Sequence, residues 1–361
     1  MNVPWTESLT PALAKMTAGR DWDRVQEAAC GDWLLLSPVG SGDSCWYQVE
    51  NGMDRPRALS PLEDPELPVL RQVVDRWLRR GREFRLLAWR IGRRAVFRLS
   101  RGQSSRICKL YRRERHTLTR WQVTAEINND RWRAPNVLAW DPSLRRLDIE
   151  FLPGTSLNTR WLAGRAEFGD GVHIASLLDW LAGCPVPRGF PVYEVEDEVL
   201  LLQRRLAEYQ RTLAAPPART GETVSRVIRA LRELTPVPNS LCHRDLHDKQ
   251  ILLDGDRGGL IDFDLAAAGH PALDAGNILA HLRLRAMKGA QIPWRDIVST
   301  IVDNATPTRS HSLALRVWTA SALMRLTLIY ARRRRPPELL EALETSTRAA
   351  LEGRGEWNEL V

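Results

Sequence analysis

Residues 241–279, LCHRDLHDKQILLDGDRGGLIDFDLAAAGHPALDAGNIL, hold the densest group of side chains able to perform chemistry. The loop HRDLHDKQ carries Asp245 and Gln250, and GLIDFD carries Asp262 after a glycine-containing turn. Two short strands flanking that turn would bring the three side chains to one point. This geometry suits phosphoryl transfer, in which one carboxylate takes the proton of an acceptor hydroxyl while other oxygen ligands hold Mg²⁺ on the ATP phosphates.

Two groups of elements are expected to position these side chains. Alternating apolar and polar residues predict strands in the first half, at FRLLAWR and AVFRLS (joined by IGRR into a hairpin), SRICKLYR, NVLAWD and RRLDIEFL. A charged helix over roughly 113–128 is expected after the third strand. From Trp161 onward the pattern is helical, with Pro-rich breaks. Strands followed by helices predict an α+β fold with two lobes.

An extra N-terminal module is predicted at 1–79, where the chain is irregular, turn-rich and Pro-rich. It ends in the helical pattern PVLRQVVDRWLRR before Gly81. The expected domains are therefore this module, a strand-rich lobe with a hinge at 80–154, and a helical lobe at 155–361 that carries the catalytic and metal loops.

The composition is that of a folded protein. Of the 361 residues, 43% are hydrophobic and 27% are charged, which disfavours collagen-like, coiled-coil-only and disordered chains. The net charge of +8 permits a nucleic-acid partner, but the arginines are dispersed along the chain. Lysine is scarce, so Lys109 and Lys249, which lie inside candidate motifs, stand out.

Compartment is inferred from cysteines and apolar segments. The five cysteines are odd in number and widely spaced, which predicts free, mostly buried thiols in a reducing compartment. The first residues lack the pattern of a secretory signal. Arg316 and Arg325 interrupt the apolar stretch 313–330, which favours a buried helix over a membrane span. We therefore expect a cytoplasmic protein.

The loop HRDLHDKQ followed by IDFD resembles the catalytic and metal-binding loops of the protein-kinase-like fold. Within that superfamily, IDFDLAAAGHPALD is similar to the aminoglycoside phosphotransferase family. The resemblance implies that Asp245 is the catalytic base and Asp262 the principal Mg²⁺ ligand. It also implies that Gln250 takes the place of the usual metal-binding Asn, and that Asp274 is a structural residue at the next helix start.

The resemblance extends over about residues 82–335. It implies that Lys109 reaches the ATP phosphates and pairs with Glu126, with Glu114 as a weaker candidate. It also implies an inter-lobe hinge at IEFLPGTSL, where backbone groups of Glu150, Phe151 and Leu152 would meet adenine.

Two features depart from the pattern of kinases. The hairpin connection has a single glycine, Gly92, and no GxGxxG, and Gln250 replaces Asn. Maltokinases and related sugar kinases resemble this chain in their HxDLHxxQ loop, which implies an active enzyme with a sugar acceptor. An N-terminal cap before the kinase lobes is a further similarity to maltokinases.

The sequence thus predicts an ATP- and Mg²⁺-dependent kinase acting on a small-molecule hydroxyl of a sugar, aminosugar or aminoglycoside. The alternatives are a pseudokinase scaffold, a protein kinase and, less favoured, a nucleic-acid-binding protein. Lys109 is alternatively an ordinary strand lysine, and Glu126 a solvated helix residue. A cluster of four acidic residues could face a cationic acceptor or simply complement a helix dipole. These residues are Glu194, Glu196, Asp197 and Glu198.

Overall fold

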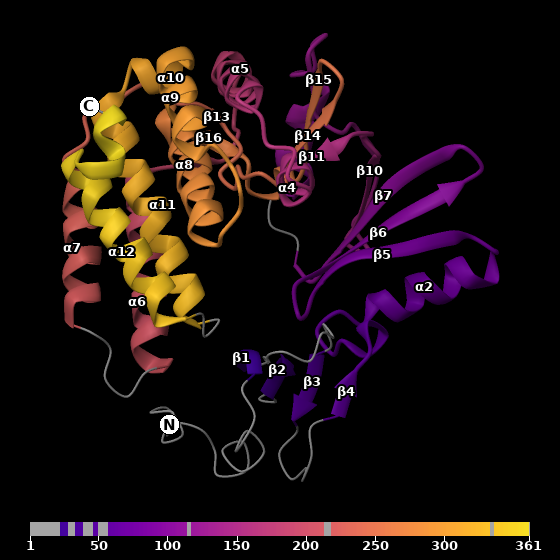
Figure 1. The fold of residues 1–361 in the computed structure, drawn as a ribbon. Helices are drawn as coiled ribbons and strands as arrows, with labels where there is room; N and C mark the ends of the chain where they lie inside the picture. The colour runs from indigo at the N-terminus through magenta and orange to yellow at the C-terminus, as the bar shows by residue number, and fades with distance from the viewer. Residues whose placement is uncertain are drawn as a thin grey trace.

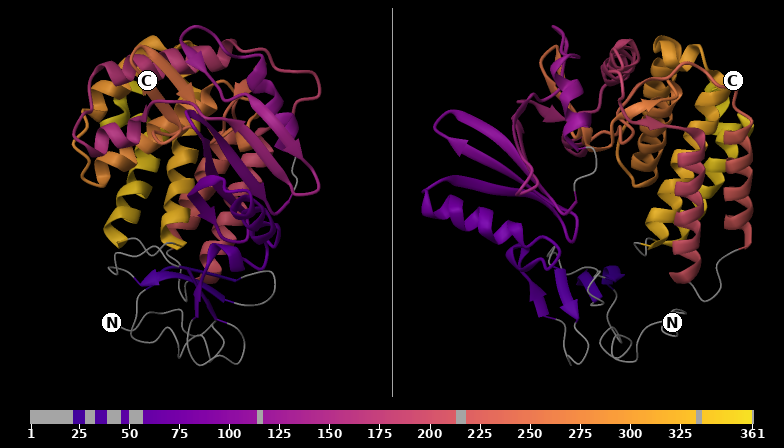
Figure 2. Two further views of the ribbon diagram at one scale, coloured as in Figure 1. Left: turned by 90° about the vertical axis from the view of Figure 1, so that its right-hand side faces the viewer. Right: turned by 180° about the vertical axis from the view of Figure 1, so that it is seen from behind.

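The computed structural model describes residues 22–27, 33–38, 46–49, 57–113, 117–212, 218–332 and 336–360. A strand-rich lobe and a helical lobe lie side by side and are joined by the chain that follows β10 (Figures 1 and 2). This arrangement confirms the expected α+β fold.

The strand-rich lobe is built on one antiparallel sheet. Its order is β5-β6-β7-β10-β9, from β5 (Glu83–Arg90), β6 (Arg94–Arg101), β7 (Ser104–Tyr111), β10 (Arg146–Glu150) and β9 (Val137–Asp141). All five predicted strands are therefore present. Alternation along β6 buries Ala95, Phe97 and Leu99 on one face and leaves the intervening residues on the other.

Helix α2 (Val69–Arg79) covers the apolar face of this sheet. Its buried residues recur every three or four positions and form one hydrophobic cluster with β6 and β7. They are Val69, Leu70, Val73, Val74 and Trp77. The sequence prediction assigned this helix to the N-terminal module, but its packing joins it to the sheet. We therefore propose that the strand-rich lobe begins near residue 60.

The preceding segment is not irregular throughout. It forms a four-stranded antiparallel sheet, β1-β2-β3-β4, from β1 (Trp22–Glu27), β2 (Trp33–Pro38), β3 (Trp46–Val49) and β4 (Arg57–Leu59). The 3₁₀ helix η1 (Pro61–Glu63) leads from this sheet towards α2. That residues 1–79 form a separate module stays a prediction.

The prediction of one long helix at 113–128 is wrong. The described part contains α3 (Thr117–Gln122) followed by the 3₁₀ helix η2 (Val123–Ala125). The side chains of Asn128 and Asn129 accept hydrogen bonds from backbone N–H groups of 131–134, which stabilises a loop instead of further helical turns.

Two small sheets deliver the polar loops of the helical lobe. One has the order β11-β14-β15-β8, from β11 (Thr155–Ser156), β14 (Ile251–Asp254), β15 (Arg257–Leu260) and β8 (Trp132–Arg133). The other has the order β12-β16-β13, from β12 (Val192–Tyr193), β16 (Ala267–Gly269) and β13 (Ser240–Cys242). The β14–β15 hairpin is the predicted pair of short strands around the turn.

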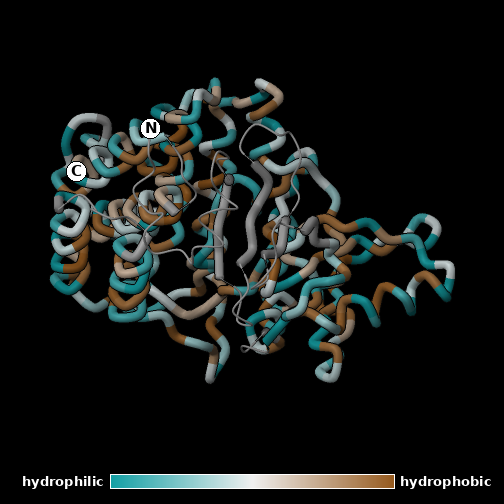
Figure 3. The backbone as a smooth tube through the Cα atoms, turned by 90° about the horizontal axis from the view of Figure 1, so that it is seen from below, coloured by the Kyte–Doolittle hydropathy of each residue, from teal (hydrophilic) through white to brown (hydrophobic). Residues whose placement is uncertain are grey.

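Helices form the rest of this lobe, and hydrophobic and hydrophilic segments alternate along them (Figure 3). They are α4 (Leu157–Leu162), α5 (Gly169–Gly183), α6 (Val195–Thr212), α7 (Ala218–Arg232), α8 (Ala272–Met287), α9 (Trp294–Asn304), α10 (Thr306–Arg309), α11 (Ser312–Arg332), α12 (Pro337–Glu352) and the 3₁₀ helices η3 (Phe263–Leu265) and η4 (Gly355–Leu360).

Helix α11 is the central helix of this lobe and packs against α8 and α12. Among the described residues it is the one helix long and apolar enough to cross a membrane, yet 72% of its apolar window is buried inside the protein. The prediction of a buried helix here is confirmed. Cys108, Cys184 and Cys242 are free thiols, as expected, while Cys30 and Cys45 lie outside the described residues.

Candidate active site

Asp245 lies on a loop that begins where β13 ends, and His243 braces this loop. The His243 Nδ1 atom accepts a hydrogen bond from the Asp245 N–H (3.3 Å), so its Nε2 carries the proton and donates to the Ile261 carbonyl (2.9 Å). One imidazole thereby fixes the Asp245 loop to the segment that leads into Asp262.

The loop backbone is also held by the buried side chain of Asp274. Its two oxygens accept hydrogen bonds from the N–H groups of His243 (2.6 Å) and Arg244 (2.8 Å). Arg244 adopts φ +68°, a left-handed conformation that is costly for a side-chain-bearing residue and that these bonds stabilise. The structural role predicted for Asp274 at the start of α8 is confirmed.

Gln250 and Asp262 meet at the base of the β14–β15 hairpin. Gln250 is buried, and its backbone carbonyl accepts a hydrogen bond from the Ile261 N–H (3.0 Å). Its side-chain Nε2 lies 3.4 Å from Oδ2 of Asp262. Asp262 has φ +76°, so the chain turns sharply there and enters η3. The structure thus brings together the two predicted metal ligands.

Lys109 reaches the same point from β7. Its Nζ lies 2.5 Å from Oδ1 of Asp262 and 2.9 Å from Oδ1 of Asp264, and 4.6 Å from the ring centroid of Trp121. Lys109 is buried, and its two aspartate partners lie 153 and 155 residues further along the chain. These contacts favour the site role over an ordinary strand lysine.

Arg94 is a second cation in this cluster, and the sequence interpretation missed it. Its Nη1 and Nη2 lie 3.0 and 2.8 Å from the two oxygens of Asp262, and Nη1 also pairs with Asp264. Burial by itself raises the pKa of Asp262, but Lys109 and Arg94 outweigh it and hold that pKa well below its ordinary value. Asp262 is therefore ionised.

Asp264 was also missed, although the second acid of IDFD was a visible signal. Beyond Lys109 and Arg94, Oδ1 of Asp264 accepts hydrogen bonds from Tyr111 Oη (2.8 Å) and Trp121 Nε1 (2.9 Å). Asp264, itself fixed by Tyr111 and Trp121, therefore helps Asp262 to hold the lysine.

The predicted ion pair between Lys109 and Glu126 is not formed. Glu126 is exposed and follows the last residue of η2, whereas the Lys109 ammonium is occupied by two aspartates of the metal loop. The short α3 places no acid next to the lysine. Glu114, the weaker candidate, lies outside the described residues.

The predicted hinge spans the end of β10 and the start of the connection between lobes. The carboxylate of Glu150 pairs with Arg133 (2.7 Å) and accepts a hydrogen bond from the side chain of Asn136 (3.0 Å). Arg98 lies over the ring of Phe151, 4.2 Å from its centroid, and Leu152 is buried. These side chains hold the segment in place, and a contact of its backbone with adenine stays a prediction.

The acidic group before and within α6 does not form one surface for a cationic acceptor. Asp197 accepts from the Glu194 N–H (2.9 Å), Glu196 pairs with Arg232 (2.8 Å), and Glu198 is buried. Glu198 pairs with Arg325 (3.1 Å) and accepts from Tyr193 (2.6 Å). Capping and ion pairing therefore account for these acids.

The half-buried Arg325 on α11 lies near the Asp245 loop. It donates to Oδ1 of Asn277, whose Nδ2 donates to the Arg244 carbonyl (3.1 Å). Burial lowers the pKa of Arg325, but Glu198, Tyr193, Asp245 and Asp274 together raise it. A fixed positive charge thus supports the backbone around Asp245 from the helical lobe.

The donor set fits Mg²⁺, which binds oxygen ligands and usually takes only one or two carboxylates together with substrate phosphates and water. Asp262 offers a carboxylate and the adjacent Gln250 an amide. The described residues contain no group of three or more His, Cys, Asp or Glu side chains that would enclose a metal. Both oxygens of Asp262 are engaged by Arg94 and Lys109, so metal binding requires one of these cations to move.

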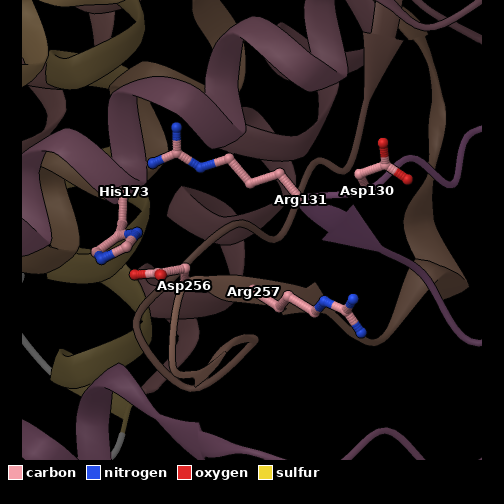
Figure 4. A pocket seen from close by; sticks show the side chains of 5 residues that line it. All are labelled: Asp130, Arg131, His173, Asp256 and Arg257. Carbon is pink, nitrogen blue, oxygen red and sulfur yellow. The ribbon is translucent and has the colours of Figure 1, made fainter.

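A separate cavity of about 490 Å³ lies beside the β14–β15 turn. It is lined by Asp130, Arg131, His173, Asp256 and Arg257 (Figure 4). Burial, followed by Arg131, lowers the pKa of His173. None of the predicted site residues lines this cavity, and we assign it no role in phosphoryl transfer.

Comparison with solved structures identifies the fold as kinase-like. Aminoglycoside phosphotransferase APH(4)-Ia matches with a TM-score of 0.57 at 13% identity, over 79% of this chain and 100% of that chain. A choline/ethanolamine kinase family protein from Mesorhizobium loti matches with a TM-score of 0.54 at 15% identity, over 77% and 90%. Choline kinase from Cryptosporidium parvum Iowa II gives 0.51 at 13% identity, over 75% and 89%.

The sequence itself establishes the family. The model of the phosphotransferase enzyme family (APH) matches residues 78–298, so the chain belongs to this family. A search of the curated proteins found no significant match. Family and fold together support the activity of a small-molecule kinase.

Proposed function

We propose that the protein transfers the γ-phosphoryl group of ATP to a hydroxyl of a sugar, aminosugar or aminoglycoside, with Mg²⁺ as cofactor. The observation that carries the proposal is the meeting of two lobes at one cluster. Lys109 extends from the strand-rich lobe to Asp262, which adjoins Gln250 and is tied through His243 to the Asp245 loop.

Asp245 is the proposed base. It is half-buried on a loop whose backbone is fixed by His243 and Asp274, and among the described residues no ion pair engages its carboxylate. A carboxylate positioned in this way accepts the proton of the acceptor hydroxyl or orients that hydroxyl towards the phosphorus.

Asp262 and Gln250 are the proposed Mg²⁺ ligands. When bound, the metal would neutralise charge on the phosphates of the nucleotide. Lys109 is proposed to position the phosphates, and the backbone at 150–152 to meet adenine. The structural match to a thermostable APH(4)-Ia mutant in a ternary complex with AMP-PNP and hygromycin B supports these roles (TM-score 0.54, 13% identity).

Two alternatives are weighed against this function. A protein kinase needs a long activation segment, whereas η3, β16 and the start of α8 occupy the short stretch between Asp262 and Asp274. One observation favours a pseudokinase, namely that Arg94 and Lys109 occupy the carboxylate of Asp262. We propose a small-molecule acceptor, with neither membrane nor nucleic acid as partner, and a cytoplasmic location consistent with the free thiols.

The test is ATP consumption by the purified protein with a panel of sugars, aminosugars and aminoglycosides, with and without Mg²⁺. Acceptor-dependent and Mg²⁺-dependent turnover that disappears in Asp262→Ala, with an unchanged circular dichroism spectrum, supports the proposal. Retained turnover in Asp262→Ala contradicts it, and Mg²⁺-dependent ATP binding without transfer to any acceptor supports the pseudokinase.

A further inference from the structure

The hairpin that should cover the nucleotide phosphates has little backbone to offer them. In kinases a glycine-rich loop covers the phosphates. Here the turn at 91–93 contains only Gly92, whose N–H donates to Oδ2 of Asp64 (2.8 Å). The next amide, that of Arg93, donates to the Arg90 carbonyl (2.9 Å). Two amides of the turn are therefore already used within the protein.

Arg94 immediately follows this turn and projects into the cluster. In the β6–β7 ladder Arg94 pairs with Tyr111 and Val96 with Lys109, so Arg94 and Lys109 lie on the same face of the sheet. Both side chains reach the carboxylate of Asp262. A group that contacts Lys109 beside Asp262 is therefore within the range of the Arg94 guanidinium.

The guanidinium has a donor to spare. Arg94 is 14% exposed in its side chain, and among the described residues its buried Nε has no hydrogen-bond partner. A buried N–H without a partner costs free energy, and a planar guanidinium binds phosphate oxygens in pairs. Arg94 thus has both the charge and the unused donor for a phosphate group.

Charge balance indicates which cation moves. Both cations also pair with Asp264, so either one keeps a carboxylate partner when it leaves Asp262. Lys109 contacts only Oδ1 of Asp262. Arg94 occupies both oxygens of Asp262, the carboxylate that a metal needs. When a nucleotide binds with its metal, the metal can replace Arg94 as the cation at Asp262. The phosphate oxygens can then pair with the displaced guanidinium.

We propose that Arg94 is a nucleotide-phosphate ligand that replaces the missing glycine-rich loop, exchanging Asp262 for the β- and γ-phosphates when MgATP binds. This inference rests on the proposed function, because it assumes that the cluster receives ATP. It adds a binding residue at the strand-rich lobe and explains why the chain dispenses with further glycines in the turn.

The experiment compares the affinities of wild type and Arg94→Ala for MgATP and for adenosine, by isothermal titration calorimetry on the full chain. We expect Arg94→Ala to weaken MgATP roughly 10- to 100-fold, as for loss of a charge-assisted contact, and to leave adenosine within about twofold. Arg94→Lys should recover part of the loss. Arg101→Ala, which removes an exposed cation at the far end of β6, is the matched control and should match wild type.

Three results overturn the inference. Unchanged MgATP affinity in Arg94→Ala shows that the phosphates do not contact Arg94. Equal losses of affinity for MgATP and for adenosine show that Arg94 only holds the two lobes together. In that case Arg94→Ala also has a lower melting temperature than wild type in a thermal unfolding scan. If wild type binds neither ligand, the proposed function fails first, and the inference fails with it. Binding that follows the expected pattern without turnover on any acceptor supports Arg94 while contradicting the transferase.

Discussion

The buried Lys109 on β7 and the half-buried Asp264 in η3 form an ion pair, with Nζ 2.9 Å from Oδ1. In the kinase pattern, the lysine that positions ATP is oriented by a glutamate from the helix that follows its strand. Here the described part of that segment contains only the short helix α3, and the carboxylate that contacts the lysine comes from two residues beyond Asp262. One short loop of the helical lobe thus supplies both the proposed metal ligand and the partner of the lysine.

Asp264→Asn should lower nucleotide affinity. The substitution keeps the shape but removes the charge that holds Lys109, so we expect MgATP to bind about tenfold more weakly, as for one charge-assisted contact. Calorimetric titration measures this. Glu126→Gln is the control, because Glu126 is exposed and away from the lysine, and it should bind MgATP like wild type. The opposite ranking of the two variants would restore the original assignment of the ion pair.

Gln250 should control the metal requirement. Because its amide adjoins Asp262, Gln250→Ala is expected to raise the Mg²⁺ concentration for half-maximal rate by about tenfold, and Gln250→Asn by less, since an oxygen ligand remains. A Mg²⁺ titration of the rate at saturating ATP measures both. Gln203→Ala, an exposed position on α6, serves as control. An unchanged Mg²⁺ requirement in Gln250→Ala would remove Gln250 from the metal site.

The free energy of unfolding should decrease as the pH is lowered from 6.5 to 4. Burial, followed by the neighbouring His311, lowers the pKa of His270 to about 4. In the unfolded chain a His has a pKa of about 6.5, so unfolding takes up a proton in this window. Stability is therefore fully present above pH 6.5 and is lost as the pH falls towards 4. The melting temperature of His270→Asn should depend less on pH there, because Asn keeps an acceptor for the Ala272 N–H but does not titrate. Parallel curves for the two proteins would contradict this.

Gly276 is required where α8 meets α11. A Cβ at this position would lie 2.6 Å from the backbone carbon of Trp318 and 2.7 Å from the nitrogen of Thr319, and backbone atoms cannot move aside cheaply. We expect Gly276→Ala to cost about 1–3 kcal/mol of unfolding free energy, measured by urea denaturation. Gly221→Ala in α7 is the control, since nothing lies within 4 Å of its Cβ, and it should be neutral or stabilising. Equal effects of the two substitutions would contradict the packing argument.

The sequence predicted those elements and loops that depend on the local pattern of residues. Alternation in FRLLAWR, AVFRLS and SRICKLYR gave the strands, and the spacing from Asp245 to Gln250 and Asp262 gave the loops around the β14–β15 hairpin. Each of these features depends on neighbours along the chain, where side-chain period and turn residues are informative.

The partners within the site could not be predicted in the same way. Arg94 and Asp262 are 168 residues apart, and their contact depends on how the two lobes meet, which no local period records. The helix at 113–128 was wrong because asparagine side chains there bond to the backbone and stop the helix. The end of the N-terminal module, which we propose to place near residue 60, could not be predicted because the pattern of α2 shows that it is amphipathic but not which sheet it covers.

Transfer of label from [γ-³²P]ATP to an acceptor by wild type and Asp245→Asn, with MgATP affinity measured for both, tests the central claim most directly. The account predicts labelled acceptor with wild type, a rate at least about 100-fold lower with Asp245→Asn, and similar MgATP affinity, because Asp245 acts on the acceptor hydroxyl. Labelled product formed by Asp245→Asn at the wild-type rate would contradict the assignment of the catalytic base and with it the proposed mechanism.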